Sequence, residues 1–153
     1  MGILMEKNES LANAGYLIGA LLFIVPLADA LLRVLPTQFG NERWRFQVLG
    51  GLSSLTLVPL IGLLVGLLAA SYIGSARVRR SIGILCVALA VLFLIVVALF
   101  IADFLNVRST FPPNVQHPAT VATTVAAVKL FATIIVLALL GLAGMNRTGY
   151  SRG

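Results

Sequence analysis

Four long apolar runs decide what this chain can fold into. They cover about residues 11–35, 46–72, 82–105 and 119–144 of the 153 residues. Each run supplies the roughly 20 apolar residues that an α-helix needs to cross the ~30 Å hydrocarbon core of a bilayer. The runs are continuous rather than alternating, and backbone polar groups in lipid must be satisfied within their own segment, so helices are favoured over barrel strands. The sequence therefore predicts an all-α membrane protein, a single domain over residues 1–153 built as a four-helix transmembrane bundle with short loops.

Composition supports this class and excludes several functions. Hydrophobic residues make up 59% of the chain and charged residues 10%, whereas soluble domains carry about 25% charged residues. The net charge of +6 is spread over short loops, so it predicts membrane orientation and not nucleic-acid binding. Cys86 is the only cysteine, which excludes an intrachain disulfide and the thiol oxidoreductases that need a cysteine pair.

The distribution of cations predicts how the bundle is oriented. With four spans, both termini lie on one side of the membrane. That side carries Lys7, Arg77, Arg79, Arg80, Arg147 and Arg152. The opposite side carries Arg33, Arg43, Arg45 and Arg108. The larger positive count favours the cytoplasm. The expected location, with both termini cytoplasmic, is a bacterial inner or intracytoplasmic membrane.

Two clusters at the ends of the apolar runs are expected to contact lipid headgroups or a partner protein. They are Arg77, Arg79 and Arg80 before the third run, and Arg43, Trp44 and Arg45 before the second. The first cluster is either a topology signal alone or a patch for anionic lipid or a partner. The second combines an aromatic ring with guanidinium groups, which suit the membrane–water interface. Asn41 is expected to cap a short interfacial helix there.

Small residues predict where helices pack closely. Gly15 and Gly19 in the first run, and Gly62 and Gly66 in the second, each have the four-residue spacing that lets two helix backbones approach. These glycines are expected to lie at helix contacts.

Prolines predict interruptions. Pro26 and Pro59 fall inside the first two runs and are expected to kink their helices. The loop 106–118 is expected to be extended or turning, because it contains three prolines within seven residues.

Apart from Arg33 near the end of the first run, three charged residues lie within the apolar runs, where a charge is costly and needs a partner. Asp29 and Asp103 fall near the outer ends of their runs, and Lys129 lies deeper in the fourth. We expect an intramembrane ion pair between Lys129 and Asp103, Asp29 or both. The alternatives are a local pair of Asp29 with Arg33, snorkelling of Lys129 to the interface, and a proton-relay or transport role.

The sequence offers no complete set of catalytic residues, so the chain is expected not to be an enzyme. His117 is the single histidine and is a weak candidate for a pigment or metal ligand. No His, Asp and Glu residues have metal-ligand spacing, so no metal site is expected. No cofactor is implied, although a bound lipid or pigment is compatible with the sequence.

One segment resembles a known group. Residues 35–50 (LPTQFGNERWRFQVLG) and 58–62 (VPLIG) resemble small four-span bacterial proteins, among them the cyanobacterial proteins linked to hormogonium polysaccharide secretion. The shared pattern is an outer loop that leads into a proline-containing second span. The resemblance covers about 30 residues and implies an accessory membrane protein, with no catalytic residues to carry over.

Two functions remain open from the sequence. The first is a non-enzymatic accessory subunit of a larger bacterial membrane complex, either energy-converting (including photosynthetic) or part of a secretion machinery. Its expected partners are the bilayer and other membrane subunits. The second is a small oligomeric ion-coupled transporter that uses Asp29, Asp103 and Lys129.

Overall fold

The computed structural model describes residues 2–35 and 37–146, with side chains from residue 10 onward. Within these residues the fold is helical and has no strand. The elements are α1 (Gly2–Val34), α2 (Glu42–Leu55), α3 (Leu57–Ile73), α4 (Ala76–Val107), the 3-10 turn η1 (Arg108–Thr110) and α5 (Pro113–Met145). Of the cations used to predict orientation, Arg147 and Arg152 lie outside the described residues, and so does the side chain of Lys7.

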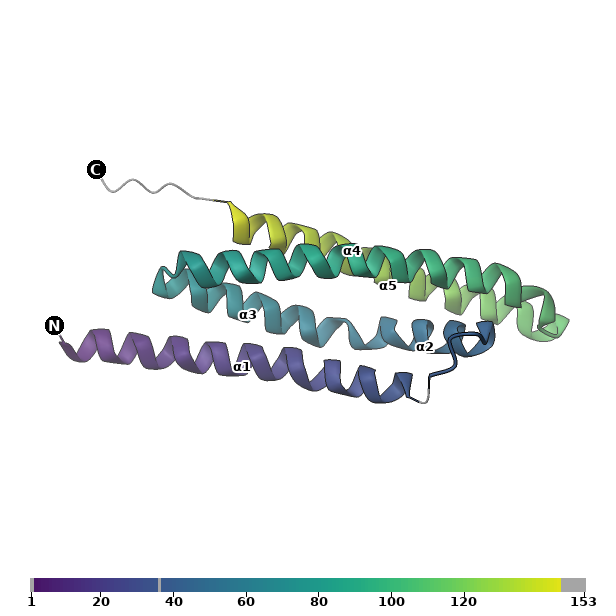
Figure 1. Cartoon of the computed structure of the whole chain (residues 1–153), viewed down its shortest axis with the longest axis horizontal. Helices are drawn as coiled ribbons and strands as arrows, with labels where there is room; N and C mark the ends of the chain where they lie inside the picture. Colours follow the sequence, from purple (N-terminus) through teal and green to yellow (C-terminus); the bar gives the residue numbers. More distant parts are fainter. Residues whose placement is uncertain (1, 36, 147–153) are drawn as a thin grey trace.

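The helices lie side by side along the long axis of an elongated bundle (Figure 1). The start of α1 and the end of α5 lie at the same end of the bundle. Three segments are long and apolar enough to cross a membrane: Ser10–Val34, Ala76–Thr110 and Pro113–Met145. The pair α2 and α3 forms a fourth candidate if the two helices are taken together. These helices indicate a multi-pass membrane protein.

The second apolar run, expected over residues 46–72, is not one continuous helix but two helices with a break between them. The axes of α2 and α3 differ by 44°, and the break falls at Thr56. Pro59 explains this position. It has no N–H to donate to the carbonyl of Leu55, and its ring crowds that carbonyl, so it favours a break at this turn. The first regular bond beyond the break runs from Leu60 N to Thr56 O, at 3.3 Å.

The other prolines behave differently. The helix α1 continues through Pro26 without a break. The expectation of a non-helical segment up to Pro118 is wrong, because α5 begins at Pro113 and includes Pro118. Pro113 sits at the first helical position, where its missing N–H is not needed and its fixed φ suits the helix. The loop before α5 is therefore shorter than predicted, and α5 is longer.

Glycines bring α1 and α3 into backbone contact. A Cβ placed on Gly62 would lie 2.7 Å from the carbonyl oxygen of Gly19 and 2.9 Å from Phe23 N. A Cβ on Gly19 would lie 2.9 Å from Gly62 O and 3.1 Å from Gly66 N. In the same contact, a Cβ placed on Gly15 would lie 3.1 Å from Ala69 Cβ. The four glycines named from the sequence thus lie where these two helices meet.

A second glycine contact joins α4 to α5, and the sequence analysis did not identify it. A Cβ on Gly144 would lie 2.7 Å from Gly83 Cα, and one on Gly141 would lie 2.6 Å from a methyl carbon of Val87. The molecule is therefore two closely packed helix pairs, α1 with α3 and α4 with α5. Each pair depends on residues that have no side chain at the crossing.

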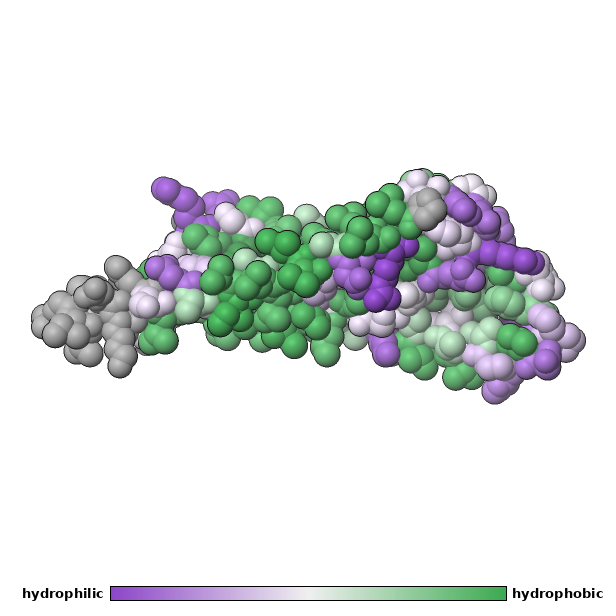
Figure 2. Space-filling model, turned by 90° about the horizontal axis from the view of Figure 1, so that it is seen from below, coloured by the Kyte–Doolittle hydropathy of each residue, from purple (hydrophilic) through white to green (hydrophobic). Residues whose placement is uncertain are grey.

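A small apolar core lies between and within the pairs. One cluster contains Leu63, Cys86, Ala90 and Leu137. A second, nearer to α2, contains Val97, Phe100 and Leu130. On the face that Figure 2 shows, an apolar band crosses the molecule and hydrophilic residues lie on both sides of it. A few are near the end where α1 begins, and more form a patch near the middle and continue toward the end where α4 meets α5. The apolar band is suited to lipid and not to water.

Candidate functional site

A buried ion pair fixes α2 to α4. Arg45 Nε lies 3.0 Å from Asp103 Oδ2, and Arg45 Nη2 lies 2.6 Å from Asp103 Oδ1. The side chain of Asp103 is 4% exposed and that of Arg45 is 30% exposed. This two-point geometry matches the planar guanidinium to the carboxylate. Arg45 was expected to contact lipid headgroups; instead it turns inward, because it is the cation that reaches the buried carboxylate of α4.

Local structure holds this arginine in place. Asn41 caps α2, and its side-chain oxygen accepts hydrogen bonds from Arg43 N at 3.0 Å and Trp44 N at 3.2 Å. The predicted cap is confirmed. Arg45 Nη1 also donates to the carbonyl of Phe39, at 2.5 Å, across the loop that leads into α2. The loop and the first turn of α2 therefore orient one side chain toward α4.

An aromatic cluster surrounds the same junction. The ring of Phe46 stacks on Phe100 with centroids 5.2 Å apart and planes 3° apart, and it also contacts Phe104 and Phe111. Trp44 meets Phe39 edge to face at 5.6 Å, on the outer side of α2. The aromatic residues of α2 thus divide between a contact with α4 and a contact with the loop before α2.

The expected ion pair of Lys129 with Asp29 or Asp103 is not formed. Asp103 is taken by Arg45, and Asp29 pairs with Arg33 one turn along α1, with Arg33 Nη2 3.0 Å from Asp29 Oδ2. Lys129 is exposed, and its ammonium makes no ion pair with any residue that the structure describes. The local alternative for Asp29 is the one observed.

Lys129 lies instead beside a hollow of about 470 Å³ between α2 and α5. The polar residues around this hollow are Gln47, Ser53, Thr123 and Lys129. The hydroxyls of Ser53 and Thr123 donate to carbonyls of their own helices, at 2.7 and 2.8 Å. The ammonium of Lys129 and the amide of Gln47 are therefore the side-chain donors left to bind something in the hollow.

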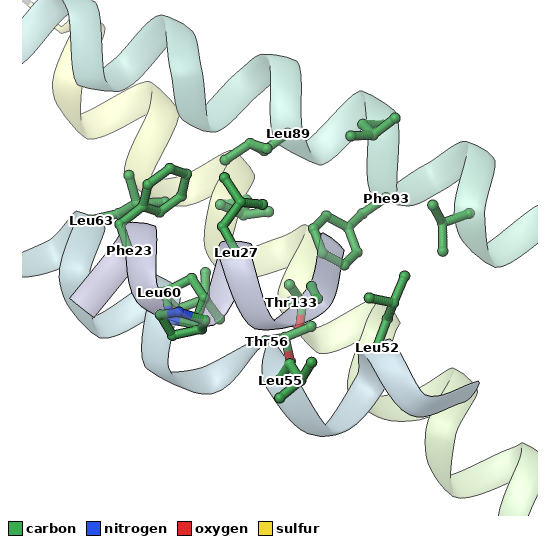
Figure 3. Close-up of a pocket in the computed structure, with 16 residues that line it drawn as sticks. Phe23, Leu27, Leu52, Leu55, Thr56, Leu60, Leu63, Leu89, Phe93 and Thr133 are labelled. Carbon is green, nitrogen blue, oxygen red and sulfur yellow. The ribbon is translucent and has the colours of Figure 1, made fainter. Parts of the chain in front are cut away.

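An apolar cavity of about 180 Å³ lies next to the break between α2 and α3. Its walls come from α1, α2, α3, α4 and α5, and they include Phe23, Leu27, Leu52, Leu63 and Phe93 (Figure 3). Thr56 and Thr133 are the hydroxyl residues of its lining. A hollow with so apolar a lining is suited to hydrocarbon.

The arginine cluster predicted to contact lipid lies at the start of α4. Arg77, Arg79 and Arg80 line a hollow of about 670 Å³ that also involves Gly144 and Met145 at the end of α5. Arg79 donates to the carbonyl of Asn146 at 3.2 Å. Guanidinium groups are thus gathered at the end of the bundle where α5 ends.

The remaining candidates do not form a site. His117 is exposed in the first turns of α5, not in a loop, and Cys86 is fully buried in the core of α4. Among the described residues no group of three His, Cys, Asp or Glu side chains could hold a metal ion.

Comparison with protein-family models, curated proteins and solved structures found no match to this chain. The resemblance of residues 35–50 and 58–62 to small four-span bacterial proteins therefore stays a prediction.

Proposed function

We propose that this chain is a four-span protein of a bacterial inner or intracytoplasmic membrane and a non-catalytic accessory subunit of a larger membrane complex. Both termini face the cytoplasm, on the side of the arginines at the start of α4. In this arrangement α3 and the end of α2 form one span. Since the 17 residues of α3 rise only about 25 Å, the last turn of α2 completes the crossing of a ~30 Å core.

The observation that carries the proposal is the position of α1. This helix packs on α3 and touches α2, while its opposite face is uncovered. Leu17, Leu21, Ile24 and Leu31 follow one another along that face and are 64%, 53%, 58% and 62% exposed. The described connections between helices are short, so the protein has helix faces and little else to present to a partner. An apolar helix at the edge of a bundle is suited to contact another membrane protein.

The transporter hypothesis has one supporting observation, the interrupted helix at Thr56 beside an internal cavity. Broken helices mark substrate sites in many transporters. However, Asp29, Asp103 and Lys129 do not converge on that cavity, and both aspartates already have arginine partners. The geometry therefore favours the accessory role.

The test is purification of the tagged chain from its native membrane in mild detergent, followed by native gel electrophoresis and identification of whatever comigrates. We expect a complex larger than the monomer. The variant L17A/L21A/I24A removes side chains from the free face of α1 and should release the partner. The matched control V91A/L94A/I95A removes equally exposed side chains from α4 and should not. A monodisperse parent protein that migrates alone, without any partner, would refute the proposal.

A further inference from the structure

Lys129 lines a hollow that is suited to a ligand. It is a cation on a helix that spans the membrane in the proposed topology, and no acidic residue among the described ones pairs with it. A cation on such a helix is a candidate for a functional contact. The hollow beside it offers a second donor, the amide of Gln47, and no acidic residue lines it. An ammonium and an amide N–H with no carboxylate beside them can together bind an anion.

The depth of Lys129 indicates which anion can reach it. Arg79 donates to the carbonyl of Asn146, so these two residues mark one level at the cytoplasmic end. Lys129 lies about 25 Å from that level along α5, at 1.5 Å per residue. In a core ~30 Å thick, its ammonium therefore reaches the outer boundary of the hydrocarbon, where the headgroups of the outer leaflet begin.

The apolar cavity adjoins this hollow on both walls. On α5, Thr133 lines the cavity and Lys129 lines the hollow, and the hydroxyl of Thr133 donates to the carbonyl of Lys129 at 2.9 Å. At the end of α2, Ser53 lines the hollow and Thr56, the residue of the break, lines the cavity. Thr56 Oγ1 lies 3.3 Å from Ser53 O. The hollow with its polar donors, on the outer side, is thus followed within one helical turn by the apolar cavity on the inner side.

We propose that the groove between α2 and α5 binds an anionic phospholipid of the outer leaflet. Its phosphate contacts Lys129 and Gln47, and one acyl chain enters the cavity beside the break at Thr56. The cavity volume of about 180 Å³ accommodates part of a chain, since a cavity of about 150 Å³ in another protein takes up benzene. The inference requires that the chain spans the membrane but does not depend on the accessory role.

The experiment measures lipid retention by native mass spectrometry of the full-length protein. The probes are phosphatidylglycerol and phosphatidylcholine with identical chains. The parent protein should prefer the anionic lipid, and K129M should lose about fivefold or more of that preference, the value of one cation near the membrane surface. K129R should keep the preference. R108Q removes another exposed outer cation and should have no comparable effect.

The acyl chain is tested separately. A30L adds bulk inside the cavity that Ala30 lines and should weaken retention of both lipids about equally, leaving the headgroup preference unchanged. Helical content and thermal unfolding of each variant show that the fold persists. Unchanged retention in A30L would overturn the placement of the chain. A K129M protein that still prefers phosphatidylglycerol, or an R108Q protein that loses the preference equally, would overturn the site.

Discussion

At the scale of single residues, burial and geometry separate two arginine–aspartate ion pairs. Arg33 and Asp29 are neighbours on α1 and remain 57% and 47% exposed. Arg45 and Asp103 come from different helices, and Asp103 is almost fully buried. An exposed pair one turn apart contributes little, whereas removing one partner of a buried pair leaves a charge without compensation.

We predict that R45M destabilises the protein much more than R33M. The Asp103 carboxylate would stay in the core without its partner, and an uncompensated buried charge is strongly destabilising. Loss of the exposed pair costs less than about 1 kcal/mol. Unfolding titrations with SDS in mixed micelles measure both. Equal effects of the two substitutions would show that the Arg45–Asp103 pair is not the one that fixes α2 to α4.

Residue-level predictions from sequence were uneven for an identifiable reason. The partner of Asp29 could be named as an alternative, because Arg33 lies one turn away on the same helix. The partner of Asp103 is 58 positions distant at Arg45, and no local pattern distinguishes Arg45 from Arg43. Only the packing of α2 on α4 selects one of them.

At the scale of elements, glycines decide how closely the helices approach. The first pair, α1 with α3, uses glycines whose four-residue spacing is visible in the sequence. The second pair, α4 with α5, uses Gly83 against Gly141 and Gly144, whose spacing of three does not stand out. Close backbone approach stabilises membrane helix pairs through packing and not through the hydrophobic effect.

We predict that G62A weakens the contact between α1 and α3. The added Cβ would lie 2.7 Å from Gly19 O, so α1 must shift, and overpacking of this kind costs about 1–3 kcal/mol. The control is G51A in α2, where a Cβ meets no atom within 4 Å. That substitution should stabilise by no more than about 1 kcal/mol, through helix propensity. Thermal unfolding in detergent compares the two, and a harmless G62A would contradict the close contact.

A second element-scale prediction concerns the break between α2 and α3. P59A restores an N–H donor and removes the crowding of the Leu55 carbonyl, so the two helices should straighten. Spin labels at positions 43 and 71 should then move apart by about 3 Å, from the 44° bend and a 1.5 Å rise per residue. Pulsed electron spin resonance measures the distance. P26A in the same labelled background should leave it unchanged, since α1 is unbroken.

At the scale of the whole molecule, the proposed topology can be tested with introduced cysteines. Cys86 is fully buried, and C86A provides a background without thiols. In that background, S109C between α4 and α5 should react with a membrane-impermeant maleimide added to intact cells. A76C at the start of α4 should react only after the membrane is opened. Labelling of A76C in intact cells would show that the orientation is opposite to the proposed one.

The class of the molecule could be predicted because hydrophobicity is summed over long segments. A run of 20 or more apolar residues needs no partner to be recognised, so the helical, membrane-type character follows from residues 82–105 and 119–144 alone. The ends of the helices were less predictable, because Pro113 and Pro118 can open a helix as well as end one. Whether residues 42–73 are one helix or two depended on where Pro59 interrupts the backbone.

The sequence alone established a helical chain suited to a bilayer, the glycines of the first helix pair and the cap at Asn41, because each depends on neighbouring residues or on summed apolarity. The tertiary structure decided that Arg45 and not Lys129 pairs with Asp103, that α4 and α5 meet at Gly83, and that Lys129 faces a hollow beside an apolar cavity. These features join residues from different helices. The distances between these residues depend on how the helices pack, and the packing depends on all the helices together.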